Sequence, residues 1–383
     1  MAMPSFCMLA FTASVLQLGM AATVPLFRIQ ASSLFEAGKA HGKAAAGLIH
    51  GFLGVSELTA LSAFTFETSL GRASFAALKA ANVPVYPEYV DEMAGIATGA
   101  NVSLDTIWMI NLLQELENLM PNDIHVGEEH CTDVMTWTVD RALVHGHNED
   151  WSTAVSPYMY FMAYEASPNG ANFSQAAGLC YPGMIIGNAV TFNDRGIYYT
   201  QNALYPKSSR NDGFAMNFVQ RRALDHASTL AELERELQVS GQALGFSLNM
   251  VSMQEHQAAN IEVYQDMNNV APLGSNLSHM NIFKHLPGIP QREKHTDSTM
   301  HRQAEMDRLP APTSIRDVVA RLGNTNDAEY PIYGPKTMVT TVVNAASGRL
   351  YGWFGVNPSR NEPTWTWDLH TFFPSAAAVT FVA

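Results

Sequence analysis

The sequence is poor in cysteine, in basic residues and in long apolar runs. Its 383 residues include three cysteines, Cys7, Cys131 and Cys180, which are too few for a disulfide scaffold. The 22 basic residues are outnumbered by 35 acidic ones, which gives a formal net charge of −13. That charge argues against nucleic acid and against stable membrane association, and it weakly favours a cationic ligand. After residue 22, no apolar stretch is long enough to span a bilayer.

The first 22 residues differ from the rest of the chain. They form an apolar run that ends in small residues near positions 20–22, a pattern typical of a signal peptide. A membrane anchor and a buried first helix are the alternatives. Sequons at Asn101, Asn172 and Asn276 are compatible with a secretory route. We therefore expect a protein of the secretory pathway, either secreted or delivered to a vacuole or lysosome.

After a short strand, the first part of the chain is predicted to be helical. A short strand at 24–29 precedes a helix that Ser32 or Ser33 caps. Gly38 and Gly42 lie inside this helix and destabilise it unless another element packs closely there.

A second helix is predicted from Ser103 to Pro121. Asn111 and Glu115 are four residues apart on its apolar face. They either brace a site or lie at a helix edge in contact with water.

Beyond residue 131 the pattern changes to hairpin strands with pairs of helices between them. The 47% apolar content is enough for a large core, and no linker or repeat divides the chain. This order of elements favours one α+β body in which helices cover antiparallel sheets. Strands are predicted at 133–138, 142–145, 158–166, 184–192, 196–202, 246–253, 259–264, 337–344 and 349–354, and helices at 214–226, after Thr229, after Asp297 or Ser298, and at 314–323.

Cys131 opens the first strand of a predicted hairpin, and a polar, acidic segment precedes it. If the bond before Cys131 is cut, the new α-amino group and the thiol belong to one residue. Their ordinary pKa values are about 8 and about 8.5, so this residue holds both base and nucleophile. A flexible segment such as 121–130 can accommodate a backbone cut. The alternative is a small buried strand residue with no chemistry.

His145 and His147 are two residues apart and share one face of the return strand. With Glu149 or Asp150 they allow a zinc site. The intervening glycine argues against a metal, as does the family resemblance described below, so we expect neither metal nor cofactor.

The segment CTDVMTWTVDRALVHGHNEDW resembles the start of the catalytic chain in cysteine N-terminal nucleophile (Ntn) hydrolases of the penicillin acyltransferase type. Within that family, the likeness is greatest to the hydrolases of β-alanyl amines, such as carcinine and β-alanyl-dopamine. The resemblance implies a four-layer αββα sandwich of antiparallel sheets. It continues through residues 24–49, 178–204, 245–253, 279–285, 297–303 and 357–363.

The resemblance implies a nucleophile that self-cleavage exposes. Cys131 matches that nucleophile, and cleavage of the His130–Cys131 bond yields a small chain, 23–130, and a large chain, 131–383, within one compact domain. His130 stands where the family usually has glycine.

Three further residues, Asp150, Asn249 and Arg302, match functional positions of the family, and Asn202 is a candidate without such a match. Asp150 matches the acid of the N-x-D motif that contacts the free amino group, and here Glu149 makes the motif Asn-Glu-Asp. Asn249 matches an asparagine of the oxyanion hole, and Arg302 matches an arginine near the substrate pocket. Asn202 is either a second oxyanion or pocket residue or a strand-end residue that bonds backbone groups.

These matches imply a self-processing cysteine amidohydrolase. Its substrate is a small amide, such as a β-alanyl amine or another N-acyl amine, and its acyl group passes through a thioester on Cys131. The processed enzyme is an α/β heterodimer, with further dimerisation left open. The alternatives are an acyltransferase that passes the acyl group to another amine, and an inactive secreted binding protein of the same fold.

Overall fold

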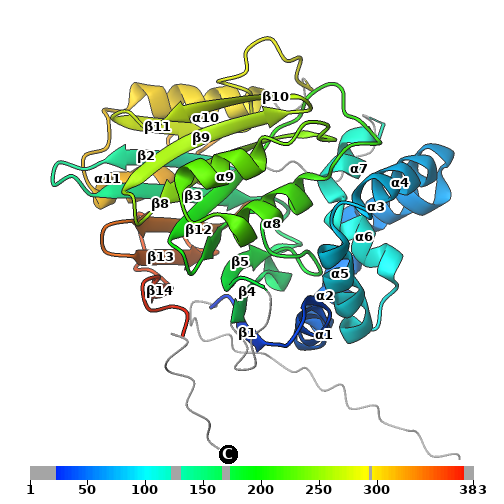
Figure 1. Ribbon diagram of the computed structural model, residues 1–383. Coiled ribbons are helices and arrows are strands. Elements are labelled where there is room, and N and C mark those ends of the chain that lie inside the picture. The colour runs from blue at the N-terminus through cyan, green and yellow to red at the C-terminus, as the bar shows by residue number, and fades with distance from the viewer. Residues whose placement is uncertain (1–22, 122–130, 166–172, 293–295, 375–383) are drawn as a thin grey trace, which may run out of the picture.

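The computed structural model describes residues 23–121, 131–165, 173–292 and 296–374. The predicted leader, His130 and the sequon at Asn172 lie outside these ranges. In the described part, two β-sheets stack face to face and helices cover their outer faces (Figure 1).

The larger sheet, sheet A, has the strand order β1-β4-β5-β6-β7-β8-β9-β10. Its neighbouring strands are antiparallel except β1 and β4, which are parallel. The strands are β1 (Leu26–Gln30), β4 (Tyr160–Glu165), β5 (Ala176–Cys180), β6 (Thr191–Asn193), β7 (Ile197–Ala203), β8 (Gly245–Ser252), β9 (Gln257–Tyr264) and β10 (Met267–Pro272).

The smaller sheet, sheet B, is antiparallel throughout and has the order β11-β2-β3-β12-β13-β14. The hairpin that begins at Cys131 supplies two of its inner strands. The strands are β2 (Thr132–Trp137), β3 (Leu143–Asp150), β11 (Asn276–His279), β12 (Thr337–Asn344), β13 (Arg349–Phe354) and β14 (Trp365–Asp368).

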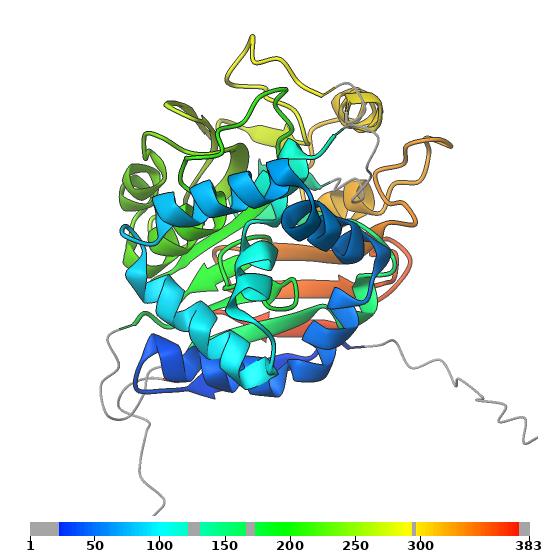
Figure 2. The same cartoon turned by 90° about the vertical axis from the view of Figure 1, so that its right-hand side faces the viewer.

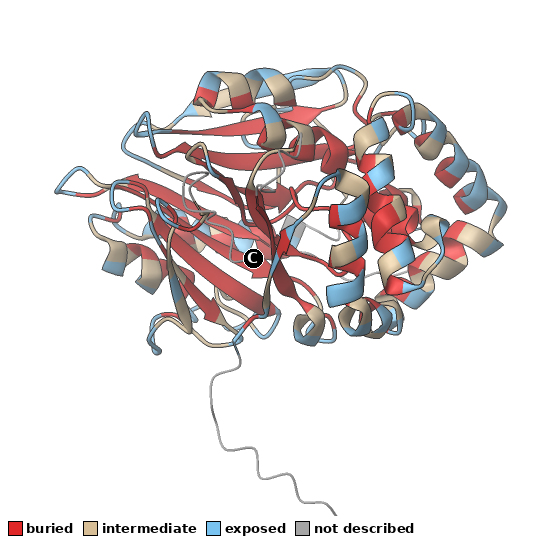
Figure 3. Ribbon diagram, turned by 60° about the horizontal axis from the view of Figure 1, so that its bottom comes forward, coloured by how far each residue is buried: buried red, intermediate tan, exposed pale blue. Residues whose placement is uncertain are grey.

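Two pairs of helices complete the layers. Helices α8 (Met216–His226) and α9 (Leu230–Leu237) pack on sheet A, and α10 (Thr296–Arg308) and α11 (Ile315–Leu322) pack on sheet B. Buried residues are concentrated in the strands between them (Figure 3). The predicted four-layer α+β sandwich is therefore confirmed.

A further group of helices lies across one end of the sheets (Figure 2). In this group, α1 and α5 pack against each other through glycines. A Cβ added at Gly38 would lie 2.0 Å from the carbonyl oxygen of Glu92, and one at Gly95 would lie 2.1 Å from that of Phe35. The close packing expected around Gly38 and Gly42 is therefore confirmed. The helices are α1 (Leu34–Ala44), α2 (Ala46–Leu53), α3 (Ser56–Glu67), α4 (Ser69–Asn82), α5 (Pro87–Ala100), α6 (Leu104–Asn111) and α7 (Leu113–Leu119).

Outside the hairpin that begins at Cys131, three expected elements differ from the structure. The strand predicted at 184–192 is wrong except for β6, because Gly187 and Ala189 have φ angles of +136° and +72°, which an extended strand excludes. The helix predicted from Ser103 is divided at Leu112 into α6 and α7. Helix α10 begins at Thr296, before the expected cap at Asp297 or Ser298.

Asn111 and Glu115 are buried, so the water-exposed alternative is wrong for both. The Asn111 amide donates to the Gly183 carbonyl at 3.0 Å, and its oxygen accepts from the Ile185 N–H. Glu115 accepts from the Met216 N–H at the start of α8, and burial raises its pKa to about 7. The two side chains thus connect α6 and α7 to the segment between β5 and β6 and to α8.

Among the described residues, no single helix has the length and apolarity to cross a membrane. Helices α2 and α3 meet those criteria together, but they are bent by 74° relative to each other.

Candidate active site

The pairing of β2 with β3 determines which side chains gather near Cys131. Asp133 lies opposite His147, and Met135 lies opposite His145. Since strand side chains alternate between faces, Asp133, His145 and His147 project toward sheet A. β3 extends to Asp150, beyond the predicted end at His145, so the whole His-Gly-His-Asn-Glu-Asp motif lies on a strand.

Asp133 is the centre of a buried hydrogen-bond network between the sheets. Its Oδ1 accepts from His145 Nε2 at 2.7 Å and from the Thr200 hydroxyl. Its Oδ2 accepts from His147 Nδ1 at 2.9 Å and from the Asn202 amide at 2.7 Å. Burial alone would raise the pKa of Asp133, but the His147 charge and the hydrogen bonds of both imidazoles lower it instead. The carboxylate is therefore ionised and rigidly held.

His147 lies between two carboxylates. Its Nδ1 bonds to Asp133, and its Nε2 is 3.0 Å from Glu149 Oε2. Ionised carboxylates only accept hydrogen bonds, so both ring nitrogens carry a proton. Burial opposes the charge, but Asp133 and Glu149 outweigh it and raise the pKa of His147 to about 10. His147 is thus an imidazolium cation at neutral pH.

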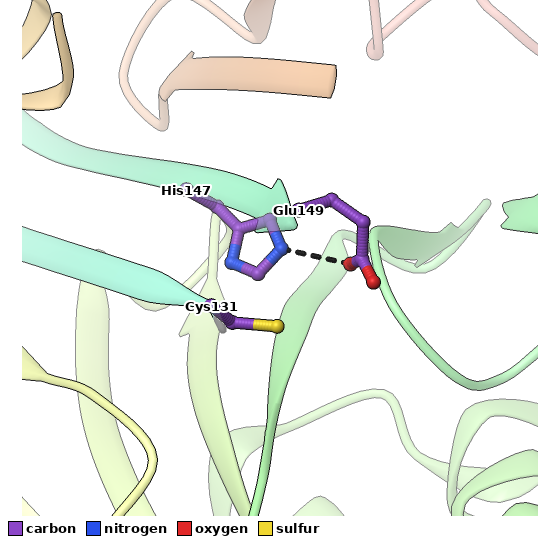
Figure 4. Close-up of side chains that lie close together, drawn as sticks. All are labelled: Cys131, His147 and Glu149. Atoms are coloured by element: carbon purple, nitrogen blue, oxygen red, sulfur yellow. Dashed lines mark hydrogen bonds and ion pairs between the residues drawn. The ribbon is translucent and has the colours of Figure 1, made fainter. Parts of the chain in front are cut away.

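The Cys131 thiol lies beside this ion pair (Figure 4). The sulfur, one ring nitrogen of His147 and one carboxylate oxygen of Glu149 are all within 4.8 Å of one another. The Tyr181 hydroxyl donates to the other Glu149 oxygen, Oε1. All of these side chains are buried. A cation next to a thiol favours the thiolate, which is the nucleophilic form.

A row of amides connects Asp133 to β8 and β9. Asn202 Oδ1 accepts from Asn249 Nδ2 at 2.7 Å, and Asn249 Oδ1 accepts from Asn260 Nδ2 at 2.9 Å. Asn249 thus uses one of its two N–H hydrogens for Asn202, and the other can serve an oxyanion. The side chain of Asn202 bonds to Asp133 and Asn249, so the alternative of a strand-end residue that bonds backbone groups is not what the structure shows.

Arg302 on α10 holds the main chain at Cys131. Its Nη1 donates to the Cys131 carbonyl at 2.7 Å and to the Thr132 hydroxyl at 2.8 Å, and its Nη2 donates to Asn281 Oδ1. The guanidinium therefore fixes the position of the residue that carries the thiol.

Asp150 lies at the end of β3, in a pocket of about 250 Å³ that Arg302, Glu329 and Lys336 also line. Burial raises the pKa of Asp150 to about 7, although the Arg302 charge opposes the shift. Its Oδ1 is buried and has no hydrogen-bond partner among the described residues. This oxygen can accept a further hydrogen bond.

The structure arranges the predicted residues in three sets. Asn202 and Asn249 bond to each other, Arg302 bonds to the backbone of Cys131, and Asp150 shares a pocket with Arg302. His130 lies outside the described residues.

The sequence did not single out Asp133, Tyr181 or Thr200. The alternation of acid and histidine across the two hairpin strands was the available signal for Asp133. The partners on sheet A are too distant in sequence to be found in this way.

The zinc alternative that uses both histidines does not match the geometry. His145 Nε2 bonds to Asp133 and also lies 3.2 Å from the Thr200 hydroxyl. Among the described residues, the potential ligands that lie together are Cys131, His147 and Glu149, without His145.

Comparison with known proteins identifies the family of the chain. The profile of the family described as acyl-coenzyme A:6-aminopenicillanic acid acyl-transferase matches residues 137–347. The chain is 22% identical over 306 residues to beta-alanyl-dopamine/carcinine hydrolase of Drosophila melanogaster, across 73% of this chain and 79% of that protein. It is 24% identical over 260 residues to the 40 kDa form of acyl-coenzyme A:6-aminopenicillanic-acid-acyltransferase of Emericella nidulans, across 64% of this chain and 66% of that protein.

A solved structure is also similar. It is an ortholog of N-acylethanolamine-hydrolyzing acid amidase from Caenorhabditis elegans, with 14% identity and a TM-score of 0.42, and the match covers 62% of this chain and 99% of that one.

The family profile spans more than half of the 383 residues. The predicted family is confirmed, and so is the prediction of an enzyme that acts on amide C–N bonds. The chain belongs to the acyl-coenzyme A:6-aminopenicillanic acid acyl-transferase family.

Proposed function

We propose that this chain is a self-processing cysteine amidohydrolase. Its substrate is a small amide, a β-alanyl amine or another N-acyl amine, and its nucleophile is Cys131. The observation that supports this best is the buried Cys131 thiol beside the His147 imidazolium, with a backbone that Arg302 holds.

The same sulfur serves two reactions in this proposal. In the precursor, the thiol attacks the His130 carbonyl, and the acyl group moves from nitrogen to sulfur. This shift breaks the C–N bond and frees the α-amino group of Cys131, and water then hydrolyses the thioester, which separates the two chains and restores the thiol. Asp150 Oδ1, which has no partner among the described residues, accepts a hydrogen bond from that amino group.

In turnover, the Cys131 sulfur forms a bond to the substrate carbonyl carbon while the α-amino group takes the thiol proton. Asn249 stabilises the tetrahedral oxyanion, and one such donor contributes about 2.7 to 4 kcal/mol. The C–N bond breaks as the α-ammonium group protonates the leaving amine. Water then hydrolyses the thioester and regenerates the thiol.

The pocket beside Asp150 has the size for a small substrate and holds charged groups of both signs in a partly apolar lining. Asp150 and Glu329 offer carboxylates to a cationic group, and Arg302 and Lys336 offer positive charge to an anionic one. The fly relative is named for a β-alanyl conjugate, whose free ammonium group would suit these carboxylates.

Mass spectrometry of the purified protein tests self-processing. The wild type is expected to yield two chains, the larger beginning at Cys131. Cys131→Ala should yield one continuous chain, and the matched control Cys180→Ala should yield two. Cleavage at position 131 in Cys131→Ala, or full activity from an uncleaved wild type, would refute the proposal.

A screen of acyl-amine conjugates, with and without a competing amine, tests the reaction. Release of free acid and amine supports hydrolysis. A new amide with the added amine supports acyl transfer, the reaction named for the fungal relative. Cleaved protein without turnover of any conjugate would leave the binding-protein alternative in place.

A further inference from the structure

The Cys131 cluster has the composition of a metal site as well as of a nucleophile site. A sulfur from Cys131, a ring nitrogen from His147 and a carboxylate oxygen from Glu149 lie within 4.8 Å of one another (Figure 4). We propose that these three side chains bind a thiophilic divalent cation of the Zn²⁺ type, and that the bound ion reversibly blocks the nucleophile.

The ligand set matches this class of ion. Zn²⁺ takes thiolate, imidazole and carboxylate ligands at about 2.0 to 2.3 Å, which places neighbouring ligand atoms of a tetrahedral site about 3.4 to 3.6 Å apart. The largest separation among the three donor atoms is at most 4.8 Å, so it has to shorten by no more than about 1.4 Å, and the pair His147 Nε2 and Glu149 Oε2, at 3.0 Å, has to open slightly. Three protein ligands leave a fourth position for water. Mg²⁺ and Ca²⁺ prefer all-oxygen sites and do not suit a thiolate.

The surroundings already hold two ligands in the required orientation. Asp133 accepts from His147 Nδ1, which leaves Nε2, now 3.0 Å from Glu149 Oε2, as the nitrogen for the ion. The Tyr181 hydroxyl holds the other oxygen of Glu149. A carboxylate on the distal nitrogen of a ligand histidine is the usual support in protein zinc sites.

Charge also balances. The ion displaces one proton from the Cys131 thiol and one from His147 Nε2, and both protons leave to solvent. Two positive charges enter and two leave, so the net charge of the buried cluster does not change. A dication can therefore bind in this low-dielectric setting without an uncompensated buried charge.

The other buried thiol of the described chain lacks such surroundings. Cys180 donates to the Gly178 carbonyl, and among the described residues it does not belong to a group of three possible ligand side chains. Cys180 is therefore a matched control for Cys131.

The experiment uses chelator-treated full-length protein and Co²⁺ as a spectroscopic probe for the Zn²⁺ site. We expect one Co²⁺ per chain, with a thiolate-to-cobalt charge-transfer absorption that Zn²⁺ removes. Cys131→Ser should lose this absorption, and Cys180→Ser should retain it. Absence of the absorption in the wild type, or its persistence in Cys131→Ser, would overturn the proposal.

A second variant tests the same site with a smaller change to the side chain, so that it is expected to fold. Tyr181→Phe removes the hydroxyl that holds Glu149 but keeps the ring, and support of this kind is worth about 10- to 100-fold in metal affinity. We expect Co²⁺ binding to weaken by that factor. Unchanged affinity would contradict the role assigned to Glu149.

Inhibition rests on the proposed function, whereas ion binding does not. With an amide substrate, one equivalent of Zn²⁺ should stop turnover, and chelator should restore it. Active enzyme without the cobalt absorption would refute the metal site alone. The absorption in a protein that turns over no amide would refute the proposed function alone.

Discussion

Two buried networks in this chain both combine histidine, carboxylate and tyrosine side chains, but His41 in one and His147 in the other have opposite charge states. The helix-side network joins the end helices to sheet A and consists of His41, Glu92, Tyr160, Tyr164 and Arg221. The inter-sheet network lies between the two sheets and consists of Asp133, His145, His147, Glu149 and Tyr181. Both His41 and His147 are fully buried.

In the helix-side network, hydroxyl groups surround the imidazole. The Tyr164 hydroxyl donates to Glu92 at 2.8 Å, so it accepts from His41 Nδ1 at 2.9 Å. Tyr160 then donates to Nε2 at 2.6 Å. Arg221 neutralises Glu92 at 2.8 Å. Burial, with the Arg221 charge, lowers the pKa of His41 to about 3.

In the inter-sheet network, carboxylates take the place of the hydroxyls, and the imidazole is itself the cation. The pKa of His147 is accordingly raised to about 10. Burial is the same for the two histidines, so their charge is decided by the groups they face. The thiols differ in the same way, because Cys131 lies beside a cation whereas burial and the Glu92 charge raise the pKa of Cys180.

The largest expected effect comes from removing the His147 cation. His147→Gln leaves no positive charge between Asp133 and Glu149, and we expect amide turnover to fall by about 10²- to 10⁴-fold. His41→Gln is the matched control, since it removes a buried histidine from the other network. We expect His41→Gln to lower stability and to retain turnover per folded molecule. Equal losses of turnover in the two variants would remove the distinction between the networks.

The next effect comes from the ion pair of the helix-side network. Arg221→Met leaves Glu92 charged and buried without its partner, which should cost about 3–5 kcal/mol in the free energy of unfolding. Denaturant titration measures the loss. The double variant Arg221→Met/Glu92→Leu removes both charges and should recover most of it. No recovery would mean that the network requires the packing of Arg221 or its second ion pair, with Asp225 at 3.1 Å, rather than the pair with Glu92.

A smaller effect on the free energy of unfolding is expected where α1 packs against α5, the helix that carries Glu92. In Gly38→Ala, the new methyl group would overlap the Glu92 carbonyl oxygen, and overpacking of this kind typically costs about 1–3 kcal/mol. Gly47→Ala on α2 is the control, because a Cβ added there would have no neighbouring atom within 4 Å. It should be neutral or stabilising by up to about 1 kcal/mol. Similar midpoints for both variants in thermal unfolding would contradict the close packing.

The smallest effect is a difference in pH dependence, measured with a chelator present so that no ion occupies the cluster. His41 has a folded pKa of about 3 and an unfolded pKa of about 6.5, so its stability contribution is present above pH 6.5 and is lost on acidification. His147 has a folded pKa of about 10, so its contribution is present below pH 6.5 and is lost as pH rises toward 10. Each slope is at most about 1.4 kcal/mol per pH unit.

Denaturant titrations of the wild type, His41→Gln and His147→Gln across this range measure the two contributions. His41→Gln should flatten the acid side of the stability profile, and His147→Gln should flatten the alkaline side. The opposite assignment would show that the two charge states are reversed.

Local features were predictable because their causes lie within a few residues. Ser33, Thr229 and Ser314 cap their helices through hydrogen bonds to N–H groups three residues later. The hairpin between β12 and β13 has its predicted bounds. In contrast, β5 was not predicted, because alanine and glycine predominate in it and it pairs on both sides with distant strands.

The amino-acid sequence alone determined the α+β class, the hairpin that begins at Cys131 and the family, because alternation, caps and motif blocks are all read along the chain. Only the tertiary structure decided what surrounds the candidate nucleophile. Thr200 and Asn202 reach Asp133 from 67 and 69 residues away, and Arg302 reaches Cys131 from 171 residues away. Such partners meet only when the two sheets stack, so the charge of His147, and with it the proposed metal site, is a property of the assembled fold.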